Sequence, residues 1–356
     1  MKAKDLAKLL NVSPATISLL LNDKPGLSQS LRDKLTAQII ELGLEDMLKN
    51  RPSSAKPSSA SGKRKKRNDA PPSIAYISYK NDEMWDNFYS FYNGVLEGAQ
   101  QEATEVDLNL SVIYRQAEKD LVKAIHRIGH VIGAIIICDE PNADVLEELA
   151  ALEVPCVFID QFDPNFTVNS VNVDNRQSQY MIVKHLKENG HRDIGYVSCT
   201  WEDSAGDERF ISFRRAMKDL HLRSRQEWFF SAGDENGPLD SSILEERFRN
   251  VESMPTALIA QNDLQALRTV NALKHCGYRV PEDISVVGFD DNPISRVCEP
   301  PLTTVRSSRH RIGRECVAMI QRLVRLNETD TLRQPMKISI STELVIRDSV
   351  KDRTKG

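Results

Sequence analysis

Residues 11–23 read NVSPATISLLLND, a segment that has the pattern of a helix but contains no Lys or Arg. Ser13 is a favourable N-cap residue, and Pro14 suits the first helical position because the N–H that proline lacks would be unpaired there. The segment therefore predicts a helix from Pro14 to Leu21. Its apolar character leaves two interpretations open, a helix whose outer face binds a partner and a helix buried in a core.

The flanking sequence predicts two further helices within residues 1–43. Residues 5–10 place three leucines on one face, and a Pro25-Gly26 turn ends the segment quoted above. Residues 28–42 carry a second apolar stripe, which consists of Leu31, Leu35, Ile39 and Leu42. Three short helices, the first two joined by a tight turn, are typical of a helix-turn-helix.

The charges of the chain are unevenly distributed. Residues 1–70 contain 14 Lys or Arg and 7 Asp or Glu, a net charge of +7, so the total of −4 leaves −11 for the rest of the 356 residues. A basic head on an acidic body suits an N-terminal region that contacts a polyanion such as nucleic acid. Residues 50–72 are rich in Pro and Ser and predict a flexible basic linker. Its run from Lys63 to Arg67, KRKKR, is either a spacer or an arm that contacts phosphates.

The cysteines and the apolar runs indicate the compartment. The six cysteines are scattered without a C-x-x-C pair, which argues against a disulfide framework or a zinc ribbon and favours reduced thiols. The N-terminus lacks the apolar core of a signal peptide, and no run approaches the ~18 apolar residues of a membrane span. We therefore expect a cytoplasmic protein without a membrane partner.

From residue 73 onward, β-rich runs alternate with helical segments. The strand-like runs are residues 74–79, 109–114, 133–138, 155–160, 170–174, 193–198, 257–261 and 284–290. The helical patterns between them include residues 89–102, 120–127, 176–189 and 263–277. Such alternation predicts α/β architecture, with parallel sheets covered by helices on both faces. Residues 73–356 exceed one doubly wound sheet and fit two, with a ligand cleft between them at the C-terminal strand ends.

The sequence favours a binding protein over an enzyme. It contains no G-x-G-x-x-G after a strand, no Walker loop, no H-E-x-x-H and no G-x-S-x-G. His126 and His130 have a spacing compatible with a metal site, but no third ligand is evident nearby, so we interpret them as a surface pair. We expect no catalytic residues, no metal and no cofactor.

Residues 4–43 resemble the helix-turn-helix head of the LacI/GalR repressor family along their whole length. The rest of the chain carries the signatures of that family in order. They are VPCVFID (154–160), VNVDN (171–175), HLKENGHRDIGYVS (185–198), RFISF (209–213), ALIAQND (257–263), GYRVPEDISVVGFDD (277–291) and PPLTTV (300–305). The resemblance implies a homodimeric transcription regulator with a periplasmic-binding-protein-like sensor made of two lobes, each a doubly wound parallel sheet.

The resemblance also implies the domain limits. A helix-turn-helix DNA-binding domain spans residues 1–49, the linker spans 50–72, and an effector-binding sensor spans 73–356. Within the sensor, the first lobe is expected at about 73–168 and 303–332, and the second at about 169–302 and 333–350. Relatives usually carry a hinge helix with a leucine wedge after the DNA-binding domain, and residues 44–67 match that pattern poorly. Met47-Leu48 is at best a remnant of the wedge, so a hinge helix on DNA stays an open question.

In the family the second helix enters the major groove of a double-stranded DNA operator. The DNA-binding residues predicted on this basis are Ser13, Pro14, Ala15, Thr16, Ser18, Leu19, Asn22, Lys4 and Lys24. Small and apolar side chains can contact the thymine methyl group, and hydroxyls can bind base edges or phosphates. Leu19, where many relatives carry a polar or basic side chain, either touches a base or packs in the core.

In the sensor, the resemblance assigns effector-binding positions at or after strand ends. The residues carried over by motif are Asp160, Arg209, Asn262, Asp263 and Asp290, and a further position falls within residues 233–236. Three aromatic residues that follow the first strand, Tyr79, Trp85 and Phe88, complete the predicted set. The resemblance implies a sugar or sugar derivative as the small-molecule effector, and the residues fit it, because carboxylates accept hydrogen bonds from hydroxyls and the guanidinium donates several. Asp263 and Asp290 could instead cap helices, and the three aromatic residues either stack on a sugar ring or pack in the core.

The expected function is sequence-specific DNA binding controlled by a small molecule, most simply as a repressor. Helices at residues 87–101 and 311–326 form either part of a dimer face or ordinary core. No leucine heptads follow Arg347, which favours a dimer over a tetramer. The alternative is a solute-binding module without specific DNA readout. The sequence does not specify the effector, the operator or the sign of regulation.

Overall fold

The computed structural model divides the chain into two compact units, Met1–Lys65 and Lys66–Gly356, and each is described by itself. In the second unit the structure describes residues 71–79, 85–115, 118, 120–138, 142–161, 167–199, 208–223, 225–232, 241–327 and 334–354, with the backbone alone for 85–90. In the first unit it describes Leu10, Val12, Ser13, Thr16, Ile17, Leu20, Leu35, Thr36 and Ile39.

The described residues of the first unit support the predicted N-cap and core. The Ser13 side chain accepts a hydrogen bond from the Thr16 amide at 3.0 Å, and the Ser13 carbonyl accepts one from the Ile17 amide. Thr16, Ile17 and Leu20 are helical. Four apolar side chains are buried, namely Ile17, Leu20, Leu35 and Ile39, and the last two belong to the predicted apolar stripe. One face of the quoted segment therefore packs in the core of this unit.

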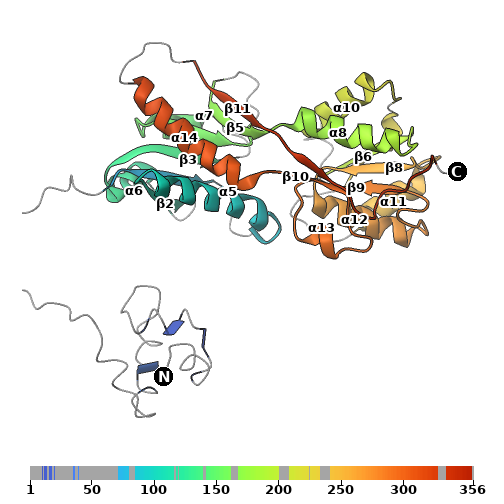
Figure 1. Cartoon of the computed structure of the whole chain (residues 1–356), viewed down its shortest axis with the longest axis horizontal. Helices are drawn as coiled ribbons and strands as arrows, with labels where there is room; N and C mark the ends of the chain where they lie inside the picture. The colour runs from blue at the N-terminus through green and yellow to red at the C-terminus, as the bar shows by residue number, and fades with distance from the viewer. Residues whose placement is uncertain are drawn as a thin grey trace, which may run out of the picture. The chain divides into compact units, whose positions relative to one another are not determined.

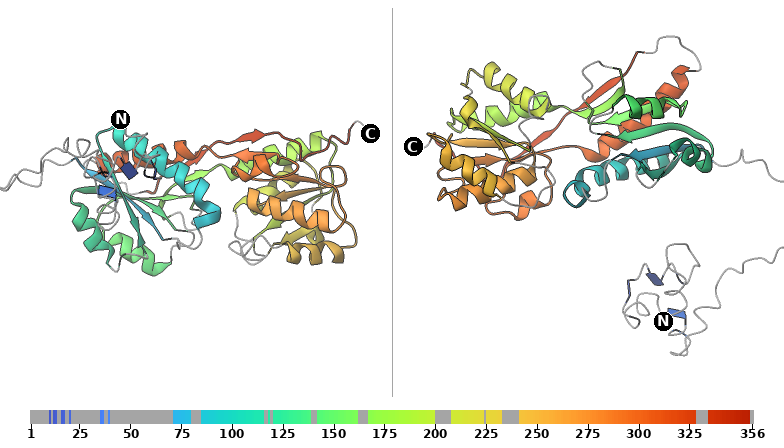
Figure 2. Two further views of the ribbon diagram at one scale, coloured as in Figure 1. Left: turned by 90° about the horizontal axis from the view of Figure 1, so that it is seen from below. Right: turned by 180° about the vertical axis from the view of Figure 1, so that it is seen from behind.

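The second unit consists of two lobes, which Figures 1 and 2 show side by side. The first lobe is built on a parallel sheet with the strand order β11-β5-β4-β3-β1-β2. Its strands are β1 (Ser73–Ser78), β2 (Asn109–Tyr114), β3 (Val131–Ile137), β4 (Cys156–Ile159), β5 (Asn169–Val173) and β11 (Lys337–Ile340). Its helices are α5 (Trp85–Glu105), α6 (Leu121–Ile128), α7 (Ala143–Ala150) and α14 (Arg309–Asn327).

Helices cover both faces of this sheet because alternate strand residues point to opposite sides. Ile74 and Tyr76 of β1 belong to the same core as α5 and α14, whereas Ala75 and Ile77 belong to the core that contains α6 and α7. The strand is buried throughout and its four central residues are Ile, Ala, Tyr and Ile, as expected for a parallel strand covered on both faces.

The second lobe repeats this architecture on a smaller parallel sheet with the order β7-β6-β8-β9. Its strands are β6 (Ile194–Ser198), β7 (Phe229–Ser231), β8 (Ala257–Ala260) and β9 (Ser285–Val287), with the helices α8 (Asn175–Glu188), α10 (Glu208–Asp219), α11 (Ser242–Asn250), α12 (Asp263–His275) and α13 (Ile294–Val297) and the short 3-10 helix η4 (Gln226–Trp228). Ile259 of β8 shares a core with α8 and α10, and its neighbours Leu258 and Ala260 share one with α11 and α12. The predicted fold class, two doubly wound parallel sheets, is confirmed.

Three segments cross between the lobes, and they correct the predicted lobe limits. We expected the second lobe to begin at residue 169 and again at 333, yet β5 and β11 both belong to the first sheet. The chain therefore crosses after each of these strands, and once more between β10 (Thr304–Arg306) and α14. After β11, the chain forms β12 (Glu343–Val345), which pairs with β10 in an antiparallel ribbon. Strands of the two sheets have the same kind of sequence pattern. The pattern alone therefore could not show which sheet β5 and β11 join.

Helices α5 and α14 cross in backbone contact. A Cβ atom added at Gly313 would lie 1.9 Å from the Val95 carbonyl oxygen and 2.5 Å from the Ala99 amide nitrogen, so only glycine allows this approach. The apolar side chains of this crossing are buried within the lobe, including Val95, Ala99, Ile312, Cys316 and Val317. These buried side chains fit the interpretation of the two helices as ordinary core, which was the alternative to a dimer face.

We expect Gly313→Ala to lower the free energy of unfolding by about 3 kcal/mol, at the upper end of the cost of overpacking, because the methyl group meets main-chain atoms that cannot rotate away. Urea denaturation of the full chain, followed by circular dichroism, measures this loss. The matched control is Gly277→Ala, where the added Cβ meets nothing within 4 Å and only the positive φ of 87° opposes it. Its cost should be about 1 kcal/mol. Equal losses for the two variants would contradict the backbone contact.

Candidate functional site

Arg209, at the start of α10, joins groups from both lobes. Its Nη1 donates a hydrogen bond to the Gln261 carbonyl at 2.8 Å, and its Nη2 lies 3.3 Å from Oδ1 of Asp290 in the same lobe. The guanidinium also lies over the Phe289 ring, 4.1 Å from its centre. Across the lobes, Nη2 is 3.9 Å from Oδ2 of Asp160, an ion-pair distance beyond that of a hydrogen bond. The structure thus brings together three predicted effector residues, Asp160, Arg209 and Asp290.

The two carboxylates follow the carboxyl ends of β4 and β9 in unusual backbone conformations. The φ angle is 52° at Asp160, 98° at Asp290 and 49° at Asp291. Asp tolerates the left-handed region better than most residues, but a φ near 98° is strained and needs support from its surroundings. Strain of this kind clusters at ligand sites and switch regions. The ends of these strands are also where open α/β sheets bind ligands.

Asp291 supplies much of that support, and the sequence analysis did not single it out. Its buried carboxylate lies 2.8 Å from Nε of Arg306 and 3.3 Å from Nη2 of Arg296, and it pairs with Arg347 on the segment after β12. Burial would raise the pKa of Asp291, but hydrogen bonds from Arg347 and Arg306 outweigh it and hold the pKa at about 2. Asp291 is therefore a structural anchor. The only sequence signal for this role was that a second Asp follows Asp290. Its arginine partners are at positions 296, 306 and 347, which the local pattern does not connect with it.

Arg309, the first residue of α14, is another residue that the sequence analysis did not single out. It belongs to the first lobe, yet its Nη2 donates to the Asp290 carbonyl and to Oδ1 of Asn292, at 3.0 Å for the latter. We expected the helix to begin at residue 311, which placed Arg309 before it. The turn Asp290–Asn292 is thus bound by arginines from both lobes.

Asn262 and Asp263 make structural contacts with groups other than Arg209. Asn262 caps α12, accepting a hydrogen bond from the Gln265 amide at 2.9 Å. Asp263 is fully buried, and its carboxyl oxygens accept hydrogen bonds at 2.6 Å from the Thr304 hydroxyl and from the Asn292 amide. Burial raises the pKa of Asp263 to about 8, with the nearby Asp290 charge adding to the shift and the Thr304 hydrogen bond opposing it. Asp263 therefore fastens β10 and the 290–292 turn to α12.

Tyr79 packs against the core on the α6 and α7 side of the first sheet. Its hydroxyl donates to Oε2 of Glu148 at 2.8 Å, and Arg115 binds the same carboxylate. For Tyr79 the packing interpretation fits these contacts better than stacking on a sugar. Trp85 and Phe88 lie in α5, and their side chains are outside the described part, as are residues 233–236.

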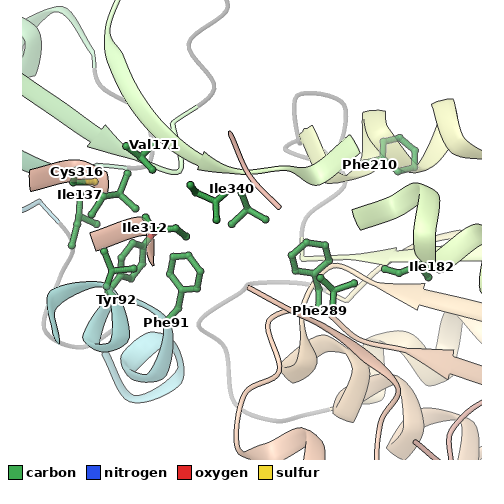
Figure 3. Packing of buried hydrophobic residues seen from close by; sticks show 14 of the residues in the cluster. Phe91, Tyr92, Ile137, Val171, Ile182, Phe210, Phe289, Ile312, Cys316 and Ile340 are labelled. Atoms are coloured by element: carbon green, nitrogen blue, oxygen red, sulfur yellow. The ribbon is translucent and has the colours of Figure 1, made fainter. Parts of the chain in front are cut away.

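A continuous apolar core connects the two lobes beside this site. It includes residues from the first lobe, from the crossing segment after β11 and from the second lobe. Figure 3 shows Phe91 of α5 and Phe289 after β9 at the facing ends of the lobes, with Ile340 between them. Each ring lies near an arginine, since the Arg309 guanidinium is 6.0 Å from the centre of the Phe91 ring and Arg209 covers Phe289. The facing surfaces thus combine charged groups with aromatic faces.

For the predicted DNA-binding surface, the structure describes Ser13 and Thr16. Their hydroxyls lie 2.8 Å apart, so Ser13 combines its capping role with a contact to the Thr16 side chain. The other predicted residues, Lys4, Pro14, Ala15, Ser18, Leu19, Asn22 and Lys24, lie outside the described residues, as do Met47-Leu48 and the run from Lys63 to Arg67. The choice between a base contact and a core position for Leu19 therefore stays a prediction.

The described part of the chain has neither a metal-binding cluster nor a membrane-spanning helix. Its His, Cys, Asp and Glu residues form no group of three that could hold a metal ion. None of its helices is both long and apolar enough to cross a bilayer.

Comparisons with known proteins identify relatives of the whole chain. Residues 183–350 match a family described as a periplasmic binding protein-like domain. The chain is 28% identical over 350 residues to the HTH-type transcriptional repressor PurR of Haemophilus influenzae (strain PittEE), with 98% of each chain covered. Similar solved structures include a complex of the transcriptional regulator CelR with cellobiose (TM-score 0.63, 22% identity, 98% of this chain and 99% of that one). The lac repressor dimer bound to operator and the anti-inducer ONPF is also similar (TM-score 0.64, 21% identity, 99% of both chains). At these identities the structures support the fold.

The pKa of Asp263 leads to a test by pH. Because the folded pKa of about 8 lies above the usual value of 3.8, the folded chain holds a proton that the unfolded chain has lost, and stability falls as pH rises towards 8. Asp263→Asn cannot ionise. Its amide oxygen can accept a hydrogen bond from the Asn292 amide, and its N–H group can donate one to the Thr304 hydroxyl. Between pH 6 and pH 8 the wild type should lose about 2 kcal/mol relative to this variant.

Urea denaturation of both chains at pH 6, 7 and 8 measures the difference. Asp263→Ala is the matched comparison, since it removes the charge and leaves the Thr304 and Asn292 donors unpaired, so it should be less stable than Asp263→Asn at every pH. Parallel pH profiles for the wild type and Asp263→Asn would show that Asp263 is ionised throughout.

Proposed function

Because this chain belongs to the LacI family of transcriptional regulators, we propose that a small polar molecule binds between its sensor lobes and changes the affinity of its helix-turn-helix for an operator. The relatives are transcriptional repressors and not enzymes, and the chain is accordingly a DNA-binding regulator. The observation that carries the proposal is Arg209, which lies within ion-pair distance of a carboxylate from each lobe. A ligand that binds all three groups contacts both lobes at once.

The chemistry of these groups favours a polyhydroxylated ligand. Carboxylates of Asp160 and Asp290 accept hydrogen bonds from hydroxyls, and Arg209 donates to ring or hydroxyl oxygens. The buried rings of Phe91 and Phe289 lie beneath the two arginines and give the site an apolar floor. A sugar or sugar derivative is therefore the proposed effector. The cellobiose complex among the similar structures agrees with this class.

Control of DNA binding follows from the two-lobed architecture. A ligand that prefers one relative position of the lobes shifts their population towards it, by an amount set by its differential affinity. We take the functional form to be a homodimer, since the similar lac repressor structure is a dimer on its operator and a helix-turn-helix dimer reads two half-sites. Repression is the sign of regulation that the names of the relatives favour.

The effector site is tested by a thermal-shift screen of the full chain against sugars, sugar derivatives and nucleosides. A sugar at about 100 times its Kd adds about 2.7 kcal/mol, a shift of roughly 4 °C for a chain of this size. Asp290→Asn, which tolerates the left-handed backbone, and Arg209→Met should each abolish the shift.

The control variant is Arg215→Met on the same helix, where the exposed arginine pairs with Asp219, which is not a predicted effector residue. It should keep the full shift. A hit that survives Asp290→Asn and Arg209→Met would place the site elsewhere. Hits confined to nucleosides would replace the sugar assignment but keep the site.

DNA recognition is tested on an operator selected from a random duplex pool with the full chain. Thr16→Ala combined with Leu19→Ala should reduce operator affinity at least about ten-fold, since two base contacts contribute about 1–3 kcal/mol each. Gel shifts at fixed salt measure the affinity, with a scrambled duplex as the nonspecific reference.

Deletion of Lys63–Arg67 is the companion variant, and it should flatten the salt dependence of binding without changing the selected sequence. Unchanged operator affinity in the double variant would remove the base-contact assignment. Failure to select any operator, together with a sugar hit, would favour a solute-binding module without specific DNA readout.

A further inference from the structure

The side chain of Arg309 packs against helix α5 of its own lobe. Its stem lies directly over Gly94 of α5, because a Cβ atom added at Gly94 would be 2.9 Å from Cβ and 3.0 Å from Cδ of Arg309. Phe91, one turn earlier on the same helix, has its ring centre 6.0 Å from the guanidinium. The glycine therefore provides a place for the arginine stem, which directs the head group away from its own lobe.

The head group binds the second lobe at its most strained segment. Nη2 of Arg309 donates to the Asp290 carbonyl and to Oδ1 of Asn292. The positive φ angles of Asp290 and Asp291 determine where this carbonyl points. A change in the backbone of the turn would therefore break or remake the contact with Arg309.

Asp290 thus takes part in two inter-lobe links that run in opposite directions. Its carboxylate binds Arg209, which comes from the second lobe and reaches towards Asp160 of the first. Its carbonyl binds Arg309, which comes from the first lobe. The link through Arg309 is closed by hydrogen bonds, whereas the 3.9 Å between Arg209 and Asp160 leaves room for the lobes to approach.

From this geometry we infer that Arg309 is a positioning residue that sets the angle between the lobes and passes a change at the Asp290 carboxylate on to that angle. The inference deepens the proposed function, because it names the residue through which an effector on Asp290 and Arg209 moves the first lobe. Arg309 acts through the main chain of the turn and need not touch the effector.

The test measures the distance between the lobes in the full chain without any ligand. Spin labels are attached through a genetically encoded ketone amino acid at Glu147 of α7 and Glu246 of α11, both exposed. Labelled chain is diluted with unlabelled chain, so that pulsed electron resonance reads distances within one chain.

Arg309→Met, which keeps much of the stem and removes every donor, should shift or broaden the distance distribution by more than about 2 Å, the scale of hinge rearrangements. Asn292→Ala removes one acceptor from the opposite lobe and retains the backbone N–H that binds Asp263, so it should cause a smaller change in the same direction. The double variant should have the same distance distribution as Arg309→Met alone, because both substitutions break the same link.

The control is Arg311→Met, two residues further along α14, where the exposed arginine pairs only loosely with Glu315 at 3.7 Å. Its distance distribution should match the wild type. If Arg309→Met does not fold, Gly94→Ala replaces it, because the added methyl displaces the Arg309 stem and should produce the same change. Distributions that are identical in the wild type, Arg309→Met and Asn292→Ala would overturn the inference. Since no ligand is present, failure of the effector screen would leave this result intact.

Discussion

The turn Asp290–Asn292 is the point on which the sensor unit depends, because charges from several distant segments meet there. Arg209 and Arg309 bind Asp290 from opposite lobes, and Asp291 is paired with Arg306 and Arg347. Buried charges are costly unless they are paired, so these contacts must form together for the chain to fold. The same turn also carries the carboxylate that the proposed effector would bind. Stability and ligand response therefore share one set of interactions.

Local patterns predicted the elements well. Residues 109–114 form a strand with the limits that the sequence indicated, and Ser13 caps its helix through a hydrogen bond to Thr16. Four short strands were missed, namely β7, β10, β11 and β12. Assignment of β5 and β11 to the first sheet required knowledge of strand pairing, which a single sequence does not contain.

Only part of the candidate site was predicted, again because a single sequence does not show which distant residues meet. Asp160 and Asp290 follow strand ends, Arg209 opens the RFISF signature in α10, and the structure places the three together. Asp263 lies in the same type of position but is buried beneath the turn, where Thr304 and Asn292 bind it. Arg309 had no signature at all. Its role arises from Gly94 on one lobe and the backbone of the turn on the other, and such three-dimensional complementarity has no counterpart in local sequence.

The order of strands in the first sheet has a consequence for biosynthesis. Strand β5 is complete at residue 173, yet its neighbour β11 begins at residue 337, and α14 reaches its partner α5 from about two hundred residues further along the chain. A nascent chain exposes the apolar surface meant for these late elements while the whole second lobe is being translated. Contacts so distant in sequence slow folding and leave surfaces open to aggregation. The first lobe must wait for α14 and β11, and the second must wait for the segment after β12, where Ser349 binds Val286 and Arg347 binds Asp291.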